Sequence, residues 1–180
     1  MKHAFMIFFV AGVLLSCNDG TKESADTKVA GASDSSNVKM DYAYTVEHPD
    51  EWVPGSRENT KMVLQSLKDF ENGNLEACMK SFADSVHLQF DELDQKFARD
   101  SVQRMFAADR KNLKSMKIDM HDFETVKSTA TGKQYVSLWY VQKWEDLKGA
   151  MDSVSVMDDL EIKDGKIISI DEKRRRFPKK

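Results

Sequence analysis

The chain has 180 residues, of which 41% are hydrophobic and 32% are charged, and this ordinary composition excludes a collagen-like or wholly disordered protein. The formal net charge is −3, although six cations stand within residues 173–180. The remainder of the chain is therefore acidic, which argues against a nucleic-acid-binding domain, because such domains carry a broad basic face.

The first residues have the pattern of an export signal. Lys2 precedes an uncharged apolar run over 4–15, which is too short to span roughly 30 Å of hydrocarbon comfortably. The string Leu14-Leu15-Ser16-Cys17 resembles the lipobox of bacterial lipoproteins, in which the Cys becomes the acylated N-terminus. We therefore expect a signal peptide over 1–16 and a lipid on Cys17, with an ordinary secretory signal as the alternative.

Residues 18–39 contain no Leu, Ile, Met or aromatic side chain. Such a segment cannot bury enough apolar area to offset its ordering entropy, so we expect a flexible tether with a random-coil span of about 25 Å. The resemblance to lipoproteins implies the bacterial cell envelope, with the membrane as partner. Asn18, rather than an Asp, follows Cys17, and we therefore expect the outer membrane.

Three helices are expected in the domain that follows, over 40–180. Apolar residues recur at helical spacing over about 56–71, again over 75–82, and from 102 to 113. Asn74 is placed to cap the second helix. Asp100, with a Gln three residues later, resembles a capping pair that opens the third helix.

Alternation of apolar and polar residues predicts the strands. Short strands are expected at 42–46 and 86–90, and Asp164 with Gly165 forms a two-residue hairpin signal, because both residues tolerate positive φ. Helices followed by a strand meander favour an α+β domain with helices on one face of a curved antiparallel sheet. The four long strand candidates are 117–127, 134–145, 151–162 and 166–173.

Four strings stand in a set order: Asn72-Gly73-Asn74-Leu75-Glu76-Ala77, Phe82-Ala83-Asp84-Ser85-Val86, Ala98-Arg99-Asp100-Ser101-Val102 and Leu160-Glu161-Ile162-Lys163-Asp164-Gly165. Together they resemble the nuclear transport factor 2-like superfamily in its SnoaL-like branch, over roughly 56–175. The resemblance implies a cone in which a curved antiparallel sheet wraps around three helices and encloses a cavity. Members include cyclases, isomerases, epoxide hydrolases, dehydratases and non-catalytic binding proteins, so the fold does not decide the function.

The ketosteroid isomerase branch of that superfamily uses a carboxylate base, a Tyr and a protonated acid. Counted from the quoted strings, the base position falls on Phe90, the Tyr position on Ser66 and the acid position on Asp158. Of these three positions, only the acid position is occupied by a residue of the required type. A proton-shuttling isomerase is therefore not expected.

Asp158 is the one catalytic candidate, because it stands in an apolar strand face. A carboxylate there is costly to bury unless it is paired or protonated. We favour a salt bridge to Arg174 or Arg99, and a protonated acid lining a cavity is the alternative.

The pairing of the two long central strands decides what surrounds Asp158. A four-residue loop over 146–149 would place Trp139 opposite Val156 and Ser137 opposite Asp158. Trp139 then either packs in the core or lines a pocket. The residues expected to line the ligand pocket are Leu88, Phe90, Phe106, Tyr135, Trp139, Val156 and Asp158.

No metal or other cofactor is expected, because His48, His87 and His121 lack the spacing of a ligand pair. Cys78 is expected in the core. The leading hypothesis is a membrane-tethered lipoprotein whose domain binds a small apolar molecule without turnover. The alternatives are an enzyme of the cyclase, dehydratase or hydrolase kind that uses Asp158, and a protein-interaction module that forms a homodimer.

Overall fold

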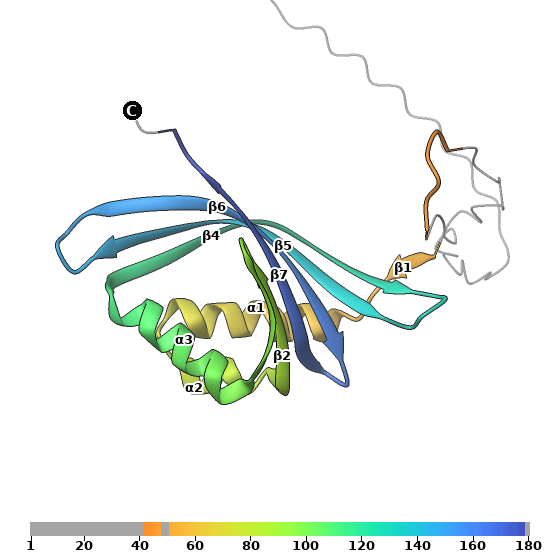
Figure 1. The fold of residues 1–180 in the computed structure, drawn as a ribbon, viewed down its shortest axis with the longest axis horizontal. Helices are drawn as coiled ribbons and strands as arrows, with labels where there is room; N and C mark the ends of the chain where they lie inside the picture. Colours follow the sequence, from red (N-terminus) through yellow and green to blue (C-terminus); the bar gives the residue numbers. More distant parts are fainter. Residues whose placement is uncertain (1–41, 48–50, 179–180) are drawn as a thin grey trace, which may run out of the picture. The chain divides into compact units, whose positions relative to one another are not determined.

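The computed structural model of the chain describes residues 42–47 and 51–178 (Figure 1). The expected signal peptide, the lipidation site Cys17 and the expected tether lie outside the described residues. Within those two described stretches, no helix is long and apolar enough to cross a membrane.

Seven strands and three helices make up the domain in the described part of the chain. In chain order they are β1 (Trp52–Pro54), α1 (Arg57–Glu71), α2 (Leu75–Met79), β2 (Phe82–Phe90), β3 (Leu93–Ala98), α3 (Arg99–Lys111), β4 (Leu113–Ser128), β5 (Gln134–Asp146), β6 (Met151–Lys163) and β7 (Lys166–Arg176).

The first two helices begin at capping residues. The Ser56 side chain accepts a hydrogen bond from the Glu58 N–H at the start of α1, and Asn74 accepts one from Ala77 at the start of α2. Each cap satisfies a backbone donor that the first helical turn leaves without an intrahelical partner. Both helices therefore begin where the sequence predicts.

The start of α3 differs from the prediction. Its N-cap is Ala98, which makes no side-chain capping bond, and Asp100 lies inside the first turn. The expected capping role of Asp100 is therefore wrong. An acidic residue in the first turn still stabilises the positive end of the helix.

The strands form one sheet in the order β1-β4-β5-β6-β7-β2-β3, and Figure 1 shows the helices on one side of this curved sheet. All neighbours are antiparallel except β2 and β7. The sheet is therefore mixed, and the antiparallel sheet predicted from the sequence is wrong in this respect. The difference arises because β7, the last strand, returns beside β2 in the same direction.

Two of the strands were not predicted. β3 turns back on β2 through Asp91, which has a positive φ of 48°, and lies at the end of the sheet. Its sequence, Leu-Asp-Gln-Lys-Phe-Ala, carries too few apolar residues to show a clear alternation. β1 is a three-residue strand beside β4. The strand expected at 42–46 is absent, since the structure has only bends there.

The core lies between the helices and the concave face of the sheet. Val63 and Cys78 of the helices meet Val86 and Leu88 of β2 there. Its most deeply buried side chains from the later elements are Val102, Val136, Leu138 and Ile167.

Candidate functional site

A cavity of about 410 Å³ lies between the helices and the concave face of β5, β6 and β7. This volume falls within the roughly 300–1,000 Å³ that is usual for small-molecule sites. Most of the wall is apolar. The aromatic members of the wall are Phe70, Phe82, Phe90, Phe106, Tyr140 and Trp144.

Asp158 projects from β6 into this wall. Only 6% of the residue is exposed, and it stands between Leu138 of β5 and Glu172 of β7 in the strand pairing. Its Oδ2 accepts a hydrogen bond of 2.8 Å from the Tyr140 hydroxyl. Its Oδ1 is buried and has no hydrogen-bond partner among the described residues. A buried polar atom without a partner is rare in folded proteins and is a natural contact point for a ligand.

Burial governs the protonation of this carboxyl. Desolvation, reinforced by the negative charge of Glu172, raises the pKa of Asp158 to about 8, although the Tyr140 hydrogen bond and Arg174 act in the opposite direction. Burial and the neighbouring carboxyl also raise the pKa of Tyr140. Asp158 is therefore a largely neutral acid near pH 7, and its proton can be donated.

Glu172 and Arg174 stand on the same face of β7, beside Asp158. The Arg174 Nε and the Glu172 Oε1 form an ion pair, in which Arg174 is 46% exposed and Glu172 is 10% exposed. Burial raises the pKa of Glu172, and the guanidinium opposes that rise. The cavity therefore has a deep acid, Asp158, and an ion pair nearer to solvent.

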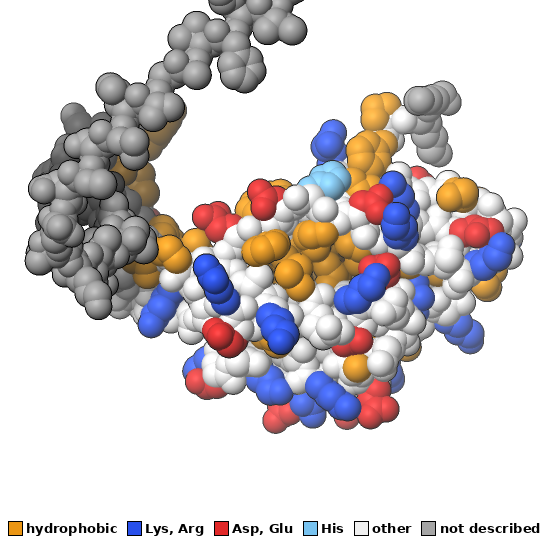
Figure 2. All heavy atoms as spheres, turned by 180° about the vertical axis from the view of Figure 1, so that it is seen from behind, with side chains coloured by type: hydrophobic (Ala, Val, Ile, Leu, Met, Phe, Trp, Pro, Cys, Tyr) orange, Lys and Arg blue, Asp and Glu red, His pale blue; other side chains and the backbone are white. Residues whose placement is uncertain are grey.

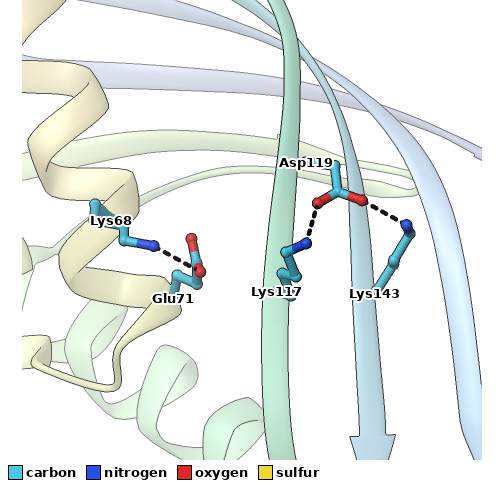
Figure 3. A network of polar contacts seen from close by, with 5 residues as sticks. All are labelled: Lys68, Glu71, Lys117, Asp119 and Lys143. Atoms are coloured by element: carbon cyan, nitrogen blue, oxygen red, sulfur yellow. Dashed lines mark hydrogen bonds and ion pairs between the residues drawn. The ribbon is translucent and has the colours of Figure 1, made fainter.

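The carboxylate of Asp119, on the surface, shows the opposite situation. Lys143 and Lys117 lie 2.5 Å and 3.0 Å from its two oxygens, and hydrogen bonds from these lysines lower the pKa of Asp119 to about 2 (Figure 3). Figure 3 also shows the ion pair of Lys68 with Glu71 on α1. Asp119 is therefore satisfied by cations, whereas Asp158 is not.

The structure brings together some of the residues predicted for the pocket and separates others. Phe90, Phe106 and Asp158 line the cavity. Leu88 and Val156 are buried in the adjacent core. Tyr135 and Trp139 do not line it, and Tyr135 instead packs edge-to-face against Trp52.

The expected pairing of β5 with β6 is wrong by one residue. Tyr140, not Trp139, stands opposite Val156, and Leu138, not Ser137, stands opposite Asp158. The connecting loop has five residues, 146–150, between the paired Glu145 and Met151. The Asp146 side chain organises it by accepting hydrogen bonds from two backbone N–H groups of the loop. A shift of one residue turns every side chain to the other face of the sheet.

The salt bridge expected for Asp158 is also absent. Arg174 pairs with Glu172, and Arg99 pairs with Asp84 at 3.2 Å. Within the part of the chain that the structure describes, Asp158 has no cation at ion-pair distance, so the favoured pairing is wrong. The alternative, an acid that lines a cavity, describes the geometry.

Two residues of this site, Tyr140 and Glu172, were not predicted from the sequence, and Arg174 was predicted beside Asp158 but as its ion-pair partner, not as that of Glu172. Tyr140 was hidden by the register error, because it was assigned to the face opposite Asp158. Glu172 and Arg174 carried a usable signal, since they alternate with the predicted β7 residue Ile170 at a period of two. The charge run at the C-terminal end hid that alternation.

Several other polar positions can be placed. Ser66, at the counted Tyr position, lines the cavity and donates a hydrogen bond to the Cys78 carbonyl. Cys78 is buried, and burial raises the pKa of its thiol. His87 contacts Asp94. The described residues contain no cluster of three metal-ligating side chains, and His48 lies outside them.

Comparison with known proteins supports the fold alone. No family model and no curated protein matches the sequence. A protein of unknown function from Burkholderia pseudomallei, described as NTF2-like, matches the structure with a TM-score of 0.55 and 11% identity, over 67% of this chain and 92% of that one. AusH from Aspergillus nidulans matches with a TM-score of 0.55 and 17% identity, over 68% and 87% of the two chains.

An enzyme is also among the similar structures. An LEH-like epoxide hydrolase from Mycobacterium tuberculosis matches with a TM-score of 0.54 and 11% identity, over 66% of this chain and 83% of that one. The shared fold does not by itself decide the function of this chain. The chain has the nuclear transport factor 2-like fold, with a curved mixed sheet over three helices and a cavity between them.

Proposed function

We propose that the domain binds a small, mostly apolar molecule with one polar group, and that the polar group contacts Asp158. The single observation that carries this proposal is the partnerless Oδ1 of a buried carboxyl in the wall of an apolar cavity. The apolar wall provides most of the binding free energy by excluding water. The carboxyl orients the ligand, because a bound polar group relieves an unsatisfied buried oxygen.

Binding can be tested with two matched substitutions. Met105 lines the cavity, whereas Met157 lies in β6 one residue from Asp158 and therefore on the other face of the sheet. A neutral apolar fluorescent dye should bind saturably to the parent chain. Met105→Trp should weaken that binding by at least about tenfold by filling the site, which corresponds to about 1.4 kcal/mol. Met157→Trp should leave it unchanged, and equal loss in both variants would contradict a specific cavity site.

We further propose that the chain is a lipoprotein of the bacterial envelope, anchored through Cys17, in the outer membrane. The support is the apolar run before Cys17 and the resemblance of the preceding residues to a lipobox. Two or more acyl chains are needed for stable anchoring, because a single chain binds a membrane only marginally.

The second cysteine supplies a control for the lipid. Cells that express the chain are labelled with a palmitate analogue. Cys17→Ser should abolish the label, and Cys78→Ser should keep it. Label that persists in Cys17→Ser would refute the lipid anchor.

An enzyme remains the second candidate, because Tyr140 lies within hydrogen-bond reach of Asp158 and a second carboxyl, Glu172, lies on the adjacent strand. A neutral carboxylic acid in a water-poor cavity can protonate a leaving or ring oxygen. The test is incubation with small epoxides and β-hydroxy ketones, followed by mass spectrometry of the products. Turnover that disappears in Asp158→Asn would establish this candidate, and no product from any of them would remove its support.

A further inference from the structure

The charged side chains that line the cavity are mostly acidic. Among the described residues of the wall, Asp109, Asp158 and Glu172 are acids, and Arg174 is the only cation. A fourth acid, Asp91 in the turn between β2 and β3, is close enough to act electrostatically on both Glu172 and Arg174. The wall therefore carries more potential negative charge than positive charge.

The cations nearby do not correct this imbalance. Arg174 is engaged by Glu172. Arg110 follows Asp109 in α3 but lies against Gly73, where its Nη2 is 3.4 Å from the position of an added Cβ, and it does not line the cavity. Lys143 is held by Asp119 on the sheet. Asp158 therefore has no protein cation to pair with in the described structure.

The apolar wall also suits a cation. Phe70, Phe90, Phe106 and Trp144 all line the cavity. The faces of aromatic rings attract cations by about 0.5–2 kcal/mol, most strongly away from water. Aromatic rings and a partnerless carboxyl oxygen in one cavity are complementary to a positively charged nitrogen on an apolar body.

We propose that the polar group of the ligand is a cation, so that the cavity takes a small apolar amine whose ammonium contacts the free Oδ1 of Asp158 and lies beside Glu172. This inference rests on the proposed binding function and names its ligand class. Carboxylic acids such as fatty acids are rejected, because their charge would face the acids of the wall, where the one described cation, Arg174, is already paired with Glu172.

Binding of an amine is coupled to the loss of a proton. In the empty cavity Asp158 is mostly protonated near pH 7, because burial and Glu172 oppose its ionisation while Tyr140 and Arg174 favour it. Asp159, the next residue, opposes ionisation weakly. An ammonium beside the carboxyl favours the carboxylate, so that the proton leaves Asp158 for the buffer as the ligand binds.

Three probes with one carbon skeleton test the inference: 4-phenylbutylamine, 4-phenylbutanol and 4-phenylbutanoate. Each is titrated by calorimetry into the full 180-residue chain at pH 7. The amine should bind about tenfold or more tightly than the alcohol, as expected for a charge-assisted hydrogen bond, and the acid should bind most weakly. In buffers of different ionisation enthalpy, the amine alone should release a proton, approaching one per site.

Two variants and a control complete the experiment. Asp158→Asn should abolish both the release of a proton and the preference for the amine, whereas its affinity for the alcohol should be unchanged. Glu172→Gln should also reduce that preference, because it leaves Arg174 without its partner. Asp171→Asn, at a surface carboxyl that pairs with Lys173 at 2.8 Å, should behave as the parent chain.

The possible results separate the two proposals. If the alcohol binds as tightly as the amine or more tightly, or if the amine binds without release of a proton, the proposal of a cationic ligand is refuted. The proposal of an apolar binding site is then still supported. If none of the three probes binds while the chain is folded, the binding function fails as well.

Discussion

At the residue scale, Tyr140 is the only side chain that hydrogen-bonds Asp158 in the described structure, through one oxygen at 2.8 Å. Tyr140→Phe removes this donor and leaves both carboxyl oxygens without a partner. The pKa of Asp158 should then rise above about 8, because the hydroxyl now lowers it. Carbon-detected NMR titration measures the shift.

The same substitution should reduce stability by about 1–3 kcal/mol, the cost of an unsatisfied buried polar group. Tyr135→Phe is the matched control on the same strand, because Tyr135 is not a cavity residue. An unchanged Asp158 titration in Tyr140→Phe would show that the hydroxyl does not control the carboxyl.

Asp158→Asn makes a pH-dependent prediction. The unfolded Asp ionises near 3.8, whereas the folded Asp158 has a pKa of about 8. Between these values the folded chain holds one proton more, so the contribution of this group to stability falls as pH rises, by at most about 1.4 kcal/mol per pH unit. Asn has no such loss. The free energy of unfolding of the variant, measured in urea melts, should therefore rise relative to that of the parent from pH 4 to pH 8.

Asp159→Asn is the control for that series. Asp159 lies on the other face of β6, where it accepts a hydrogen bond from Ser137. Its free energy of unfolding should rise relative to that of the parent much less than that of Asp158→Asn across this window, because Asp159 only weakly opposes the ionisation of Asp158. If the difference in free energy of unfolding between Asp158→Asn and the parent is constant from pH 4 to pH 8, Asp158 ionises at an ordinary pKa.

The sequence predicts that Asp158 is unusual, because one carboxylate interrupts the apolar face of Val154, Val156, Leu160 and Ile162. It does not predict its partner. That partner depends on the pairing of β5 with β6, and one additional loop residue exchanges Trp139 for Tyr140. Residue-level chemistry in a sheet therefore depends on loop length, which apolar patterning does not report.

At the element scale, α1 lies where the sequence predicts, because it has both a capping residue and a strong apolar periodicity. The expected ends of the other two helices are wrong: α2 ends at Met79 and α3 at Lys111, and Phe82 and Leu113 begin the strands β2 and β4. Phe82, at the start of β2, is 3% exposed and packs edge-to-face with Phe106 of α3. Phe82→Ala should therefore reduce the free energy of unfolding by about 3–5 kcal/mol in denaturant melts.

Leu67→Ala should reduce the free energy of unfolding by less, about 2 kcal/mol, because Leu67 is half-buried and already borders the cavity. Lys61→Ala, at an exposed position of α1, should change stability by no more than about 0.5 kcal/mol. Near-neutral values for both Phe82→Ala and Leu67→Ala would contradict this packing of the helices on the sheet.

At the scale of the whole molecule, the fold class follows from the order of the elements, whereas the parallel contact between β2 and β7 does not. That contact joins distant parts of the chain, and no local periodicity reports it.

Figure 2 shows, on the side opposite to Figure 1, apolar side chains gathered among charged ones. Met120 and Phe123 of β4 are exposed hydrophobic residues of the sheet, which is the feature that the interaction-module alternative would use.

The final prediction concerns how much of the chain the fold requires. Residues 18–39 carry no large apolar side chain, whereas the helices and sheet that enclose the core lie within residues 52–176. A chain that begins at Met40 should therefore melt within about 4 °C of the full chain, which corresponds to a stability change of about 1 kcal/mol or less. A chain that begins at Ser56 is the control. It lacks β1, which pairs with β4 and brings Trp52 against Tyr135, and it should melt clearly lower. If the melting temperature of the chain from Met40 is lowered as much as that of the chain from Ser56, the segment before Met40 contributes to the stability of the folded domain.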